Sequence, residues 1–316
     1  MKSRKVGIVG AGAVGATTAY TLAMMNSCHE IVLFDIAEGV AKGKAIDIAQ
    51  ASYYSQQDTI ITVAEKPEDM KSCDIVVVTA GVPRKGDMTR ADLLMINAKI
   101  TKQVVENIKE NSPNAIIICV SNPLDVMTYV TQRITKWDSN RIIGLAGALD
   151  GSRMAYQISK LTGYASNQTG SLVIGDHGEN MIPLPSKVSV GDIPLTSLIS
   201  KEDMEGIITR TKNGGAEIVK YLGTSGYYGP GRAIAYMVES ILNDSKVIVS
   251  SCTILNGEYG YSDVAVGVPV VLGANGVEKI IELDLDKEMK EKFAISVKSI
   301  EDGINILKEN NFFQGV

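Results

Sequence analysis

The sequence is poor in cysteine and histidine. Its 316 residues include two histidines and four cysteines, at positions 28, 73, 119 and 252. These cysteines lie too far apart for a Cys-x-x-Cys motif or a metal site, and they give no sign of a disulfide framework. We therefore expect reduced thiols and no bound metal. Cys73 and Cys119 border or lie within apolar strand-like runs, so we expect both to be buried.

Long apolar runs and excess positive charge are also missing. No apolar stretch of about 18 residues occurs, as a membrane-spanning helix would need, and residues 1–5 lead directly into a strand-like segment rather than a signal peptide. The formal net charge is −5, which argues against nucleic acid or an anionic membrane as a partner. With 45% hydrophobic residues, the chain is expected to be a globular, cytoplasmic protein.

Glycine, in contrast, forms a motif near the N-terminus. The apolar run Lys5–Val9 predicts a buried strand, Gly10, Gly12 and Gly15 follow with the spacing G-x-G-x-x-G, and residues 16–25 favour a helix. Gly10 permits a tight turn, Gly12 lets the backbone approach a pyrophosphate, and Gly15 allows close packing of helix on strand. The free N–H groups at the start of this helix would attract the phosphates.

An acidic residue ends the second predicted strand. The run Ile31–Phe34 precedes Asp35, whose carboxylate would accept hydrogen bonds from the adenosine ribose and repel a 2′-phosphate. The next residue, Ile36, supplies no arginine for that phosphate. The pattern therefore predicts binding of NAD rather than NADP. A glycine turn without a ligand is the alternative, and the placement of strand, helix and Asp35 argues against it.

Strands and helices alternate through the first half. The strands predicted after Phe34 are 60–63, 73–79 and 115–120, and the helices are 39–54 and 90–109. This alternation indicates βαβ units, and the near-continuous β-branched runs indicate a parallel sheet covered on both faces. Ligands bind beyond the carboxyl ends of such strands, where the glycine turn, residues 83–90 and residues 121–123 lie.

The pattern changes after about residue 147. We predict helices at 150–161, 201–222, 233–242 and 287–308, strands at 169–174, 247–255 and 264–271, a hairpin turning at 191–192, and a helix kink at 214–215. The fold expected from the whole chain is α/β. A Rossmann-type doubly wound parallel sheet spans residues 1–148, and a mixed α+β substrate domain follows at 149–316.

His177 is the best candidate for histidine chemistry. It follows a predicted strand and lies between Gly175 and Gly178, which predicts an exposed side chain on a tight turn. The other histidine, His29, lies in a polar loop. Taken alone, the segment leaves open a surface histidine without a catalytic role.

Five motifs together resemble the lactate/malate dehydrogenase family, in particular its lactate-dehydrogenase-like malate dehydrogenases. The resemblance spans residues 5–308. Its motifs are the glycine turn with Asp35, Ala80–Lys85 with Arg90, Ser121–Pro123, Leu149–Arg153 and Gly175–Gly178. The cofactor contacts implied are Gly10, Gly12, Gly15, Asp35, Asn97, Val120 and Asn122.

The resemblance also implies catalytic roles. His177 becomes the acid/base and Asp150 its carboxylate partner, which fixes the imidazole tautomer and favours the protonated form. Arg153 would hold the substrate's C1 carboxylate, since a guanidinium fork matches a carboxylate. Arg90 would polarise the reacting oxygen, and Asn122 would contact both nicotinamide and substrate.

Arg84 determines the substrate that the resemblance implies. Lactate enzymes of this family have glutamine at this position and malate enzymes arginine, so Arg84 points to the distal carboxylate of malate or oxaloacetate. Malate enzymes usually continue Lys-Pro-Gly, whereas this chain has Gly86 and Asp87. The missing proline loosens the backbone, and Asp87 brings a negative charge close to Arg84. A lactate or broad 2-hydroxy-acid dehydrogenase is therefore the alternative.

Two other classes of protein share parts of the pattern. A non-catalytic NAD-binding protein could have the same fold, although the complete set of site residues argues against it. NAD-dependent glycosidases share only the N-terminal glycine turn, and they use a metal site for which this chain offers no suitable cluster. The family resemblance further implies a homo-oligomer, with a tetramer favoured over a dimer.

Overall fold

The computed structural model describes residues 4–55, 58–83 and 88–315. In the first half the strands are β1 (Lys5–Val9), β2 (Glu30–Phe34), β3 (Ile60–Val63), β4 (Ile75–Val78), β5 (Ile116–Cys119) and β6 (Ile142–Gly144). The helices are α1 (Ala13–Met24), α2 (Glu38–Ser55), α3 (Arg90–Asn111) and α4 (Leu124–Thr135). Every strand and helix predicted for this half is present, with bounds shifted by a few residues, and α4 and β6 were not predicted.

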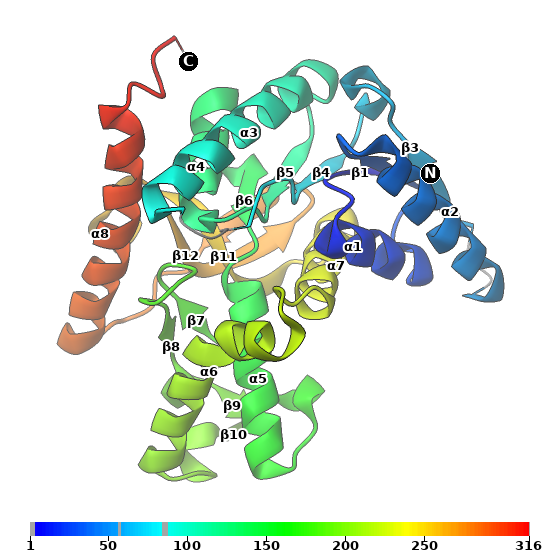
Figure 1. The fold of residues 1–316 in the computed structure, drawn as a ribbon. Coiled ribbons are helices and arrows are strands. Elements are labelled where there is room, and N and C mark those ends of the chain that lie inside the picture. Colours follow the sequence, from blue (N-terminus) through cyan, green and yellow to red (C-terminus); the bar gives the residue numbers. More distant parts are fainter. Residues whose placement is uncertain (1–3, 56–57, 84–87, 316) are drawn as a thin grey trace.

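One sheet runs through the described residues in the order β13-β12-β11-β6-β5-β4-β1-β2-β3. Strands β1 to β6 are parallel to one another and have the Rossmann order 3-2-1-4-5-6. The strand order reverses between β1 and β4, so a ligand crevice is expected beyond their carboxyl ends. Figure 1 shows α3 and α4 on one side of the sheet and α1 and α7 on the other.

Burial explains the apolar runs of the central strands. All four residues of β4 and all four of β5 are buried, because helices cover both faces of the sheet. A capping box starts α3: Asp92 N–H donates to Thr89 Oγ1 at 3.1 Å, and Thr89 N–H donates to Asp92 Oδ2 at 3.0 Å. This cap makes Arg90 the first residue of the helix.

The second half adds both helices and strands. Its helices are α5 (Gly147–Thr162), α6 (Lys201–Leu222), α7 (Tyr228–Leu242) and α8 (Lys287–Glu309). Its strands are β7 (Val173–Ile174), β8 (Ile182–Pro183), β9 (Ser189–Val190), β10 (Ile193–Pro194), β11 (Val247–Asn256), β12 (Ser262–Gly273) and β13 (Gly276–Ile280). Strands β9 and β10 form the predicted hairpin. Strands β11 to β13 extend the sheet of the first half, and Cys252 on β11 pairs with Gly144 on β6.

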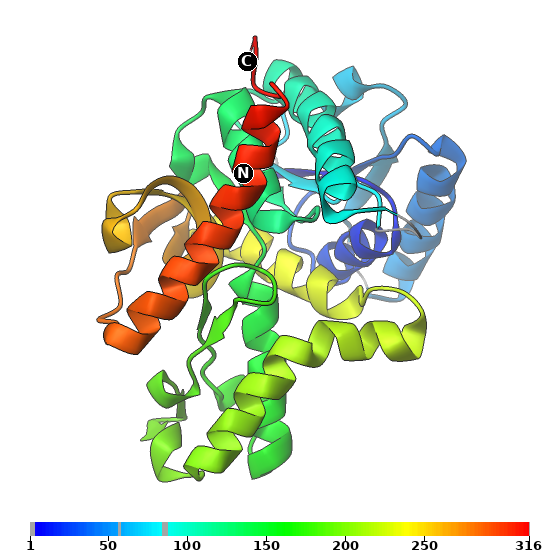
Figure 2. The same ribbon diagram turned by 60° about the vertical axis from the view of Figure 1, so that its left-hand side comes forward.

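Two predicted elements of this half differ most in their bounds. The strand expected at 169–174 is reduced to β7, because Thr169 forms only an isolated bridge with Val190. Helix α7 begins five residues earlier than predicted, since Pro230 falls in its first turn, where a missing N–H breaks no hydrogen bond. Helix α6 is continuous, and Figure 2 shows it bending between its two ends.

All four cysteines are buried, which confirms the prediction for Cys73 and Cys119. Burial raises the pKa of the Cys119 thiol to about 11, so the group is neutral in the core. No helix of the described ranges combines the length and apolar character needed to cross a membrane.

Candidate active site

The glycine turn joins β1 to α1. Gly10 has φ +103°, and a Cβ on it would lie 2.5 Å from Thr79 Oγ1. A Cβ on Gly15 would overlap the carbonyl oxygen of Gly10, so the helix approaches the strand as closely as predicted. A Cβ on Gly12 would have no described atom within 4 Å. The main chain there faces open space, which suits the approach of a phosphate.

Asp35 borders this turn at the end of β2. Its Oδ2 accepts the N–H of Ala11 at 2.7 Å, and its Oδ1 accepts the N–H of Ala37 at 2.8 Å. Each carboxylate oxygen keeps a further lone pair, which a ribose hydroxyl can occupy. Ile36 beside it is fully exposed. The turn and Asp35 therefore fit the dinucleotide expected from the sequence.

Asn97 on α3 connects the ends of β4 and β5. Its Oδ1 accepts the Val82 N–H at 2.8 Å, and its Nδ2 donates to the Asn122 carbonyl oxygen at 2.6 Å. The residue is 1% exposed, whereas Asn122 is exposed and Val120 half-buried at the end of β5. This geometry makes Asn97 a support for Val82 and Asn122. Contacts of Asn97, Val120 and Asn122 with NAD stay predictions.

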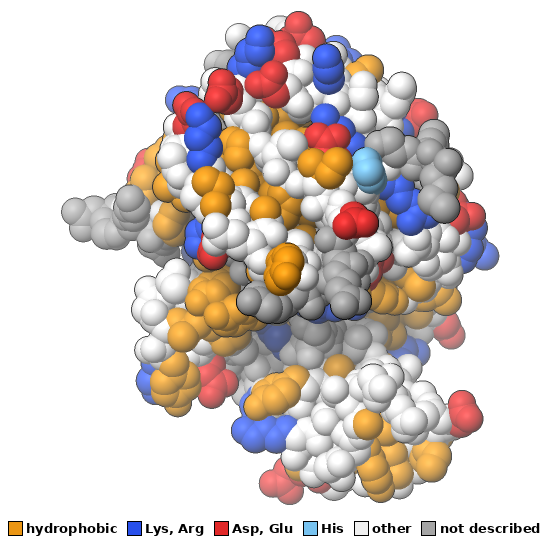
Figure 3. Space-filling view, turned by 90° about the vertical axis from the view of Figure 1, so that its right-hand side faces the viewer, with side chains coloured by type: hydrophobic (Ala, Val, Ile, Leu, Met, Phe, Trp, Pro, Cys, Tyr) orange, Lys and Arg blue, Asp and Glu red, His pale blue; other side chains and the backbone are white. Residues whose placement is uncertain are grey.

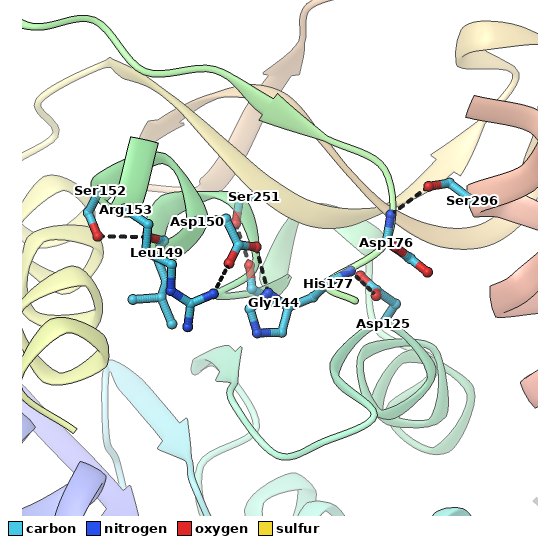
Figure 4. Close-up of polar contacts among 10 residues, drawn as sticks. All are labelled: Asp125, Gly144, Leu149, Asp150, Ser152, Arg153, Asp176, His177, Ser251 and Ser296. Carbon is cyan, nitrogen blue, oxygen red and sulfur yellow. Dashed lines mark hydrogen bonds and ion pairs between the residues drawn. The ribbon is translucent and has the colours of Figure 1, made fainter. Parts of the chain in front are cut away.

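His177, Asp150 and Arg153 form a hydrogen-bonded chain, shown in Figure 4. His177 Nδ1 lies 2.6 Å from Asp150 Oδ2, and Arg153 Nη1 donates to Asp150 Oδ1 at 2.6 Å. Asp150 is 1% exposed and lies in the first turn of α5, where the helix dipole favours its negative charge. The structure thus brings together three residues that the resemblance assigned to one site.

The turn that carries His177 is attached to three elements that are distant in sequence. Gly175 and Gly267 on β12 exchange two main-chain hydrogen bonds, of 2.9 and 3.0 Å. Asp176 N–H donates to Ser296 Oγ on α8 at 3.0 Å. His177 N–H donates to the carboxylate of Asp125 on α4 at 2.7 Å. The main chain of the turn is therefore fixed from several sides.

The prediction that His177 is exposed is wrong. Its side chain is only 13% exposed, because the turn packs against its neighbours rather than projecting into solvent. Burial acts to lower the pKa of His177, but the charge and hydrogen bond of Asp150 and the charge of Asp125 outweigh it and raise the pKa. The half-buried imidazole is therefore held ready to carry a proton.

Arg153 is packed against α6. A Cβ on Gly214 would lie 3.3 Å from Arg153 Cδ, and one on Gly215 would lie 3.4 Å from its Nη2. The guanidinium Nε is buried and has no hydrogen-bond partner in the described part of the chain. The sequence pattern related these glycines to a kink only, and it gave no signal that they make room for Arg153.

Arg90 is exposed at the start of α3. Its Nη2 lies 2.7 Å from Glu179 Oε1, so it reaches the turn that carries His177. Arg84, with Gly86 and Asp87, lies outside the described residues. Asp125 was not singled out from the sequence. In the sequence, Asp125 is marked only by its place just after the Ser121–Pro123 motif. The helix whose first turn contains it, α4, was not predicted.

Comparison with known proteins identifies the family. The model of the lactate/malate dehydrogenase NAD binding domain matches residues 4–144, and that of the lactate/malate dehydrogenase alpha/beta C-terminal domain matches residues 147–311. The chain belongs to the lactate/malate dehydrogenase family. This membership confirms the resemblance, the Rossmann-type α/β fold and NAD as the cofactor.

Individual members of the lactate/malate dehydrogenase family match over their full length. A malate dehydrogenase of Sulfurimonas denitrificans is 52% identical, over 99% of this chain and 98% of that protein. The crystal structure of Cryptosporidium parvum malate dehydrogenase is 37% identical with a TM-score of 0.93, covering 97% of this chain and 99% of that one. The lactate dehydrogenase of the same organism, complexed with lactic acid and NAD, is 34% identical with a TM-score of 0.93, covering 98% and 99%.

Proposed function

We propose that the protein is an NAD-dependent malate dehydrogenase that interconverts (S)-malate and oxaloacetate. The observation that carries the proposal is the hydrogen-bonded chain of His177, Asp150 and Arg153 in a chain whose full-length relative at 52% identity is a malate dehydrogenase. NAD, when bound, supplies the hydride acceptor and, in its reduced form, the donor.

His177 handles the proton. In malate oxidation the C2 hydrogen leaves with its electron pair, and the hydroxyl proton passes to Nε2 of neutral His177 as the C2 carbonyl forms. In the reverse direction the imidazolium returns this proton to the oxygen. Asp150 holds Nδ1–H, which leaves Nε2 free for the substrate and stabilises the imidazolium.

Two arginines serve the substrate. The planar fork of Arg153 suits the C1 carboxylate, and its packing against the glycines of α6 limits its movement. Arg90 stabilises the charge that develops on the C2 oxygen. We assign the distal carboxylate of the substrate to Arg84. This assignment rests on the sequence resemblance, and it is what favours malate over lactate.

The test is a steady-state comparison of oxaloacetate and pyruvate with NADH. A guanidinium paired with the distal carboxylate should favour oxaloacetate by about 10²-fold or more in kcat/KM, since a hydrogen bond to a charged group contributes about 1.5–3 kcal/mol and the unpaired charge disfavours pyruvate. Comparable kcat/KM values for the two substrates would support a broad 2-hydroxy-acid dehydrogenase. This is the result expected if the negative charge of Asp87 offsets that of Arg84. Absence of turnover with both would overturn the proposal.

We also propose that the chain is divided into an NAD-binding domain (1–148) and a substrate domain (149–316).

We further propose that the protein is a cytoplasmic homo-oligomer, with a tetramer favoured over a dimer. Large apolar side chains on α1, α2 and α7 support oligomerisation: Tyr20 is 47% exposed, Val40 49%, Ile46 59% and Tyr228 72%. Figure 3 shows hydrophobic side chains dispersed over the face that carries α1 and α2. Sedimentation velocity at several concentrations measures the state of assembly.

A further inference from the structure

Asp125 is a buried acid beside His177 that the proposed reaction does not use. It lies in the first turn of α4 and is 5% exposed. Its Oδ2 accepts the His177 N–H at 2.7 Å, while its Oδ1 is buried without a hydrogen-bond partner among the described residues. Figure 4 shows Asp125 on the main-chain side of His177, away from the imidazole edge that meets Asp150.

An acid in this position destabilises the fold at neutral pH. Burial raises the pKa of Asp125 to about 6, although the N–H and the charge of His177 act in the opposite direction. A buried, ionised carboxylate whose partners are one N–H and the thiol of Cys252 costs stability that an apolar residue would not cost. Such local costs are typical of functional sites.

We propose that Asp125 is a positioning residue for the proton transfer. Its carboxylate fixes the main chain of His177 through the N–H, and its negative charge stabilises the imidazolium from the side opposite Asp150. The inference rests on the proposed function, because it assigns Asp125 to the acid–base step of that reaction.

The other charged and titratable groups around His177 have different positions. Asp150 and Arg153 belong to α5, and the charge of Arg153 acts to lower the pKa of His177. The carboxylate of Asp176 accepts a hydrogen bond from Asn180 Nδ2 at 3.1 Å. The thiol of Cys252 on β11 lies close to Asp125, and burial raises its pKa well above the ordinary value. Asp125 is thus the acid that binds the main-chain N–H of His177, whereas Asp150 binds the imidazole ring.

The substitutions Asp125→Asn and Asp125→Ala separate two effects. Asparagine keeps an acceptor for the His177 N–H and removes the charge, whereas alanine removes both. Asp176→Asn is the control, since it removes the charge of the residue next to His177, whose carboxylate accepts a hydrogen bond from Asn180 and not from His177. His177→Asn marks the background rate.

The chain offers a direct readout because it has only two histidines. Labelling histidine with ¹³C at Cε1 gives two NMR signals, and His29→Gln assigns them. In Asp125→Asn the midpoint of the His177 titration should fall by about half a pH unit or more, because an opposite charge nearby favours the charged form. Asp176→Asn should move it less.

Kinetics should show the same change. The pH above which kcat/KM for oxaloacetate reduction declines should fall with the imidazole midpoint of the free enzyme. The affinity for NADH should stay within about twofold, since Asp125 is buried and bonds the main chain of His177. Asp125→Ala should share this shift and lose about tenfold more in kcat, because the main chain of His177 is released. Unchanged midpoints in Asp125→Asn, or an equal shift in Asp176→Asn, would overturn the inference.

A measurement on the wild-type chain covers the case in which the variants do not fold. Labelling histidine with ¹⁵N gives two amide signals, and that of His177 should shift in two steps: one at the imidazole midpoint read from Cε1, and a second at lower pH as its acceptor Asp125 titrates. An amide signal that follows the imidazole alone would overturn the inference. If the wild type reduces neither oxaloacetate nor pyruvate, the proposed function fails instead. If the wild type reduces oxaloacetate and His177→Asn does not, the proposed function stands. The Asp125 measurements then test the further inference alone.

Discussion

Arg90 and Glu179 form an ion pair across the mouth of the site, with Nη2 and Oε1 2.7 Å apart and both side chains 80% exposed. Exposed pairs of this kind contribute about 0–1 kcal/mol to stability. A substrate can therefore displace Glu179 from Arg90 at little cost. The pair keeps the guanidinium near the turn of His177 without burying it.

We expect Arg90→Gln to lose activity and keep stability. The loss of a group that stabilises developing charge should lower kcat by about 10²–10³-fold. The free energy of unfolding should stay within about 0.5 kcal/mol of the wild type, because the side chain is at the surface. Glu179→Gln is the control: it breaks the same pair but retains Arg90, so an equal loss of kcat in both variants would assign the effect to the ion pair.

The raised pKa of His177 predicts the pH dependence of the reaction. In the proposed reaction, oxaloacetate reduction needs the imidazolium of His177, so its kcat/KM should decline as the pH rises through a midpoint above the ordinary histidine value of about 6.5. Malate oxidation needs the neutral ring and should increase over the same interval. Asp150→Asn removes the charge that supports protonation, so the midpoint should move to lower pH. An unmoved midpoint would contradict the role of Asp150.

Asp35→Ser should weaken the preference for NADH over NADPH. The substitution removes the charge that repels a 2′-phosphate and one of two oxygens that hold the neighbouring N–H groups. We expect the ratio of kcat/KM for the two cofactors to fall by about tenfold or more, since charge-assisted contacts contribute about 1.5–3 kcal/mol. Ile36→Ser changes the adjacent exposed residue without removing charge. Equal ratios in the wild type and Asp35→Ser would exclude Asp35 as the ribose ligand.

Arg84→Gln should lower kcat/KM for oxaloacetate by about 10- to 100-fold, the value of a lost hydrogen bond between charged groups. Pyruvate should gain, because a neutral amide removes an unpaired charge from the site. Asp87→Gly, alone and combined with Arg84→Gln, shows how far Asp87 weakens the effect. A ratio of the two substrates that moves less than about twofold in both backgrounds would mean that Arg84 does not bind the distal carboxylate.

Gly214→Ala should separate stability from substrate binding. A Cβ there would crowd Arg153 Cδ at 3.3 Å, so we expect KM for oxaloacetate to increase severalfold. Alanine also stabilises a helix interior by about 0.5–1 kcal/mol relative to glycine, so the melting temperature should not fall. Gly206→Ala is the matched control in the same helix, since a Cβ there meets only the end of the Arg210 side chain. An unchanged KM in Gly214→Ala would show that Arg153 tolerates the methyl group.

Local pattern was sufficient for the parallel sheet and for the residues within single motifs. The β-branched runs predicted β4 and β5, and the glycine spacing predicted the turn before α1 because each glycine there has a steric reason visible in sequence. The pairing of His177 with Asp150 was predicted from the family resemblance. No local pattern connects the turn after β7, which carries His177, with α5, which carries Asp150.

Contacts between distant segments that no family motif covers could not be predicted. Gly214 faces Arg153 only because α6 packs on α5, and Asp125 meets His177 only because α4 lies under the turn after β7. The exposure of His177 was mispredicted for the same reason. A glycine-flanked turn indicates flexibility of the backbone, but its burial depends on which elements close around it.

The position of β6 has a consequence for any attempt to produce the two halves separately. Its isoleucines, Ile142 and Ile143, are fully buried, and its outer edge is covered by β11 from the second half. A fragment ending near residue 148 would leave that edge without its partner, as a bare apolar strand able to pair with another molecule. We therefore expect the isolated nucleotide-binding half to self-associate, because its edge strand normally pairs with a strand of the other half.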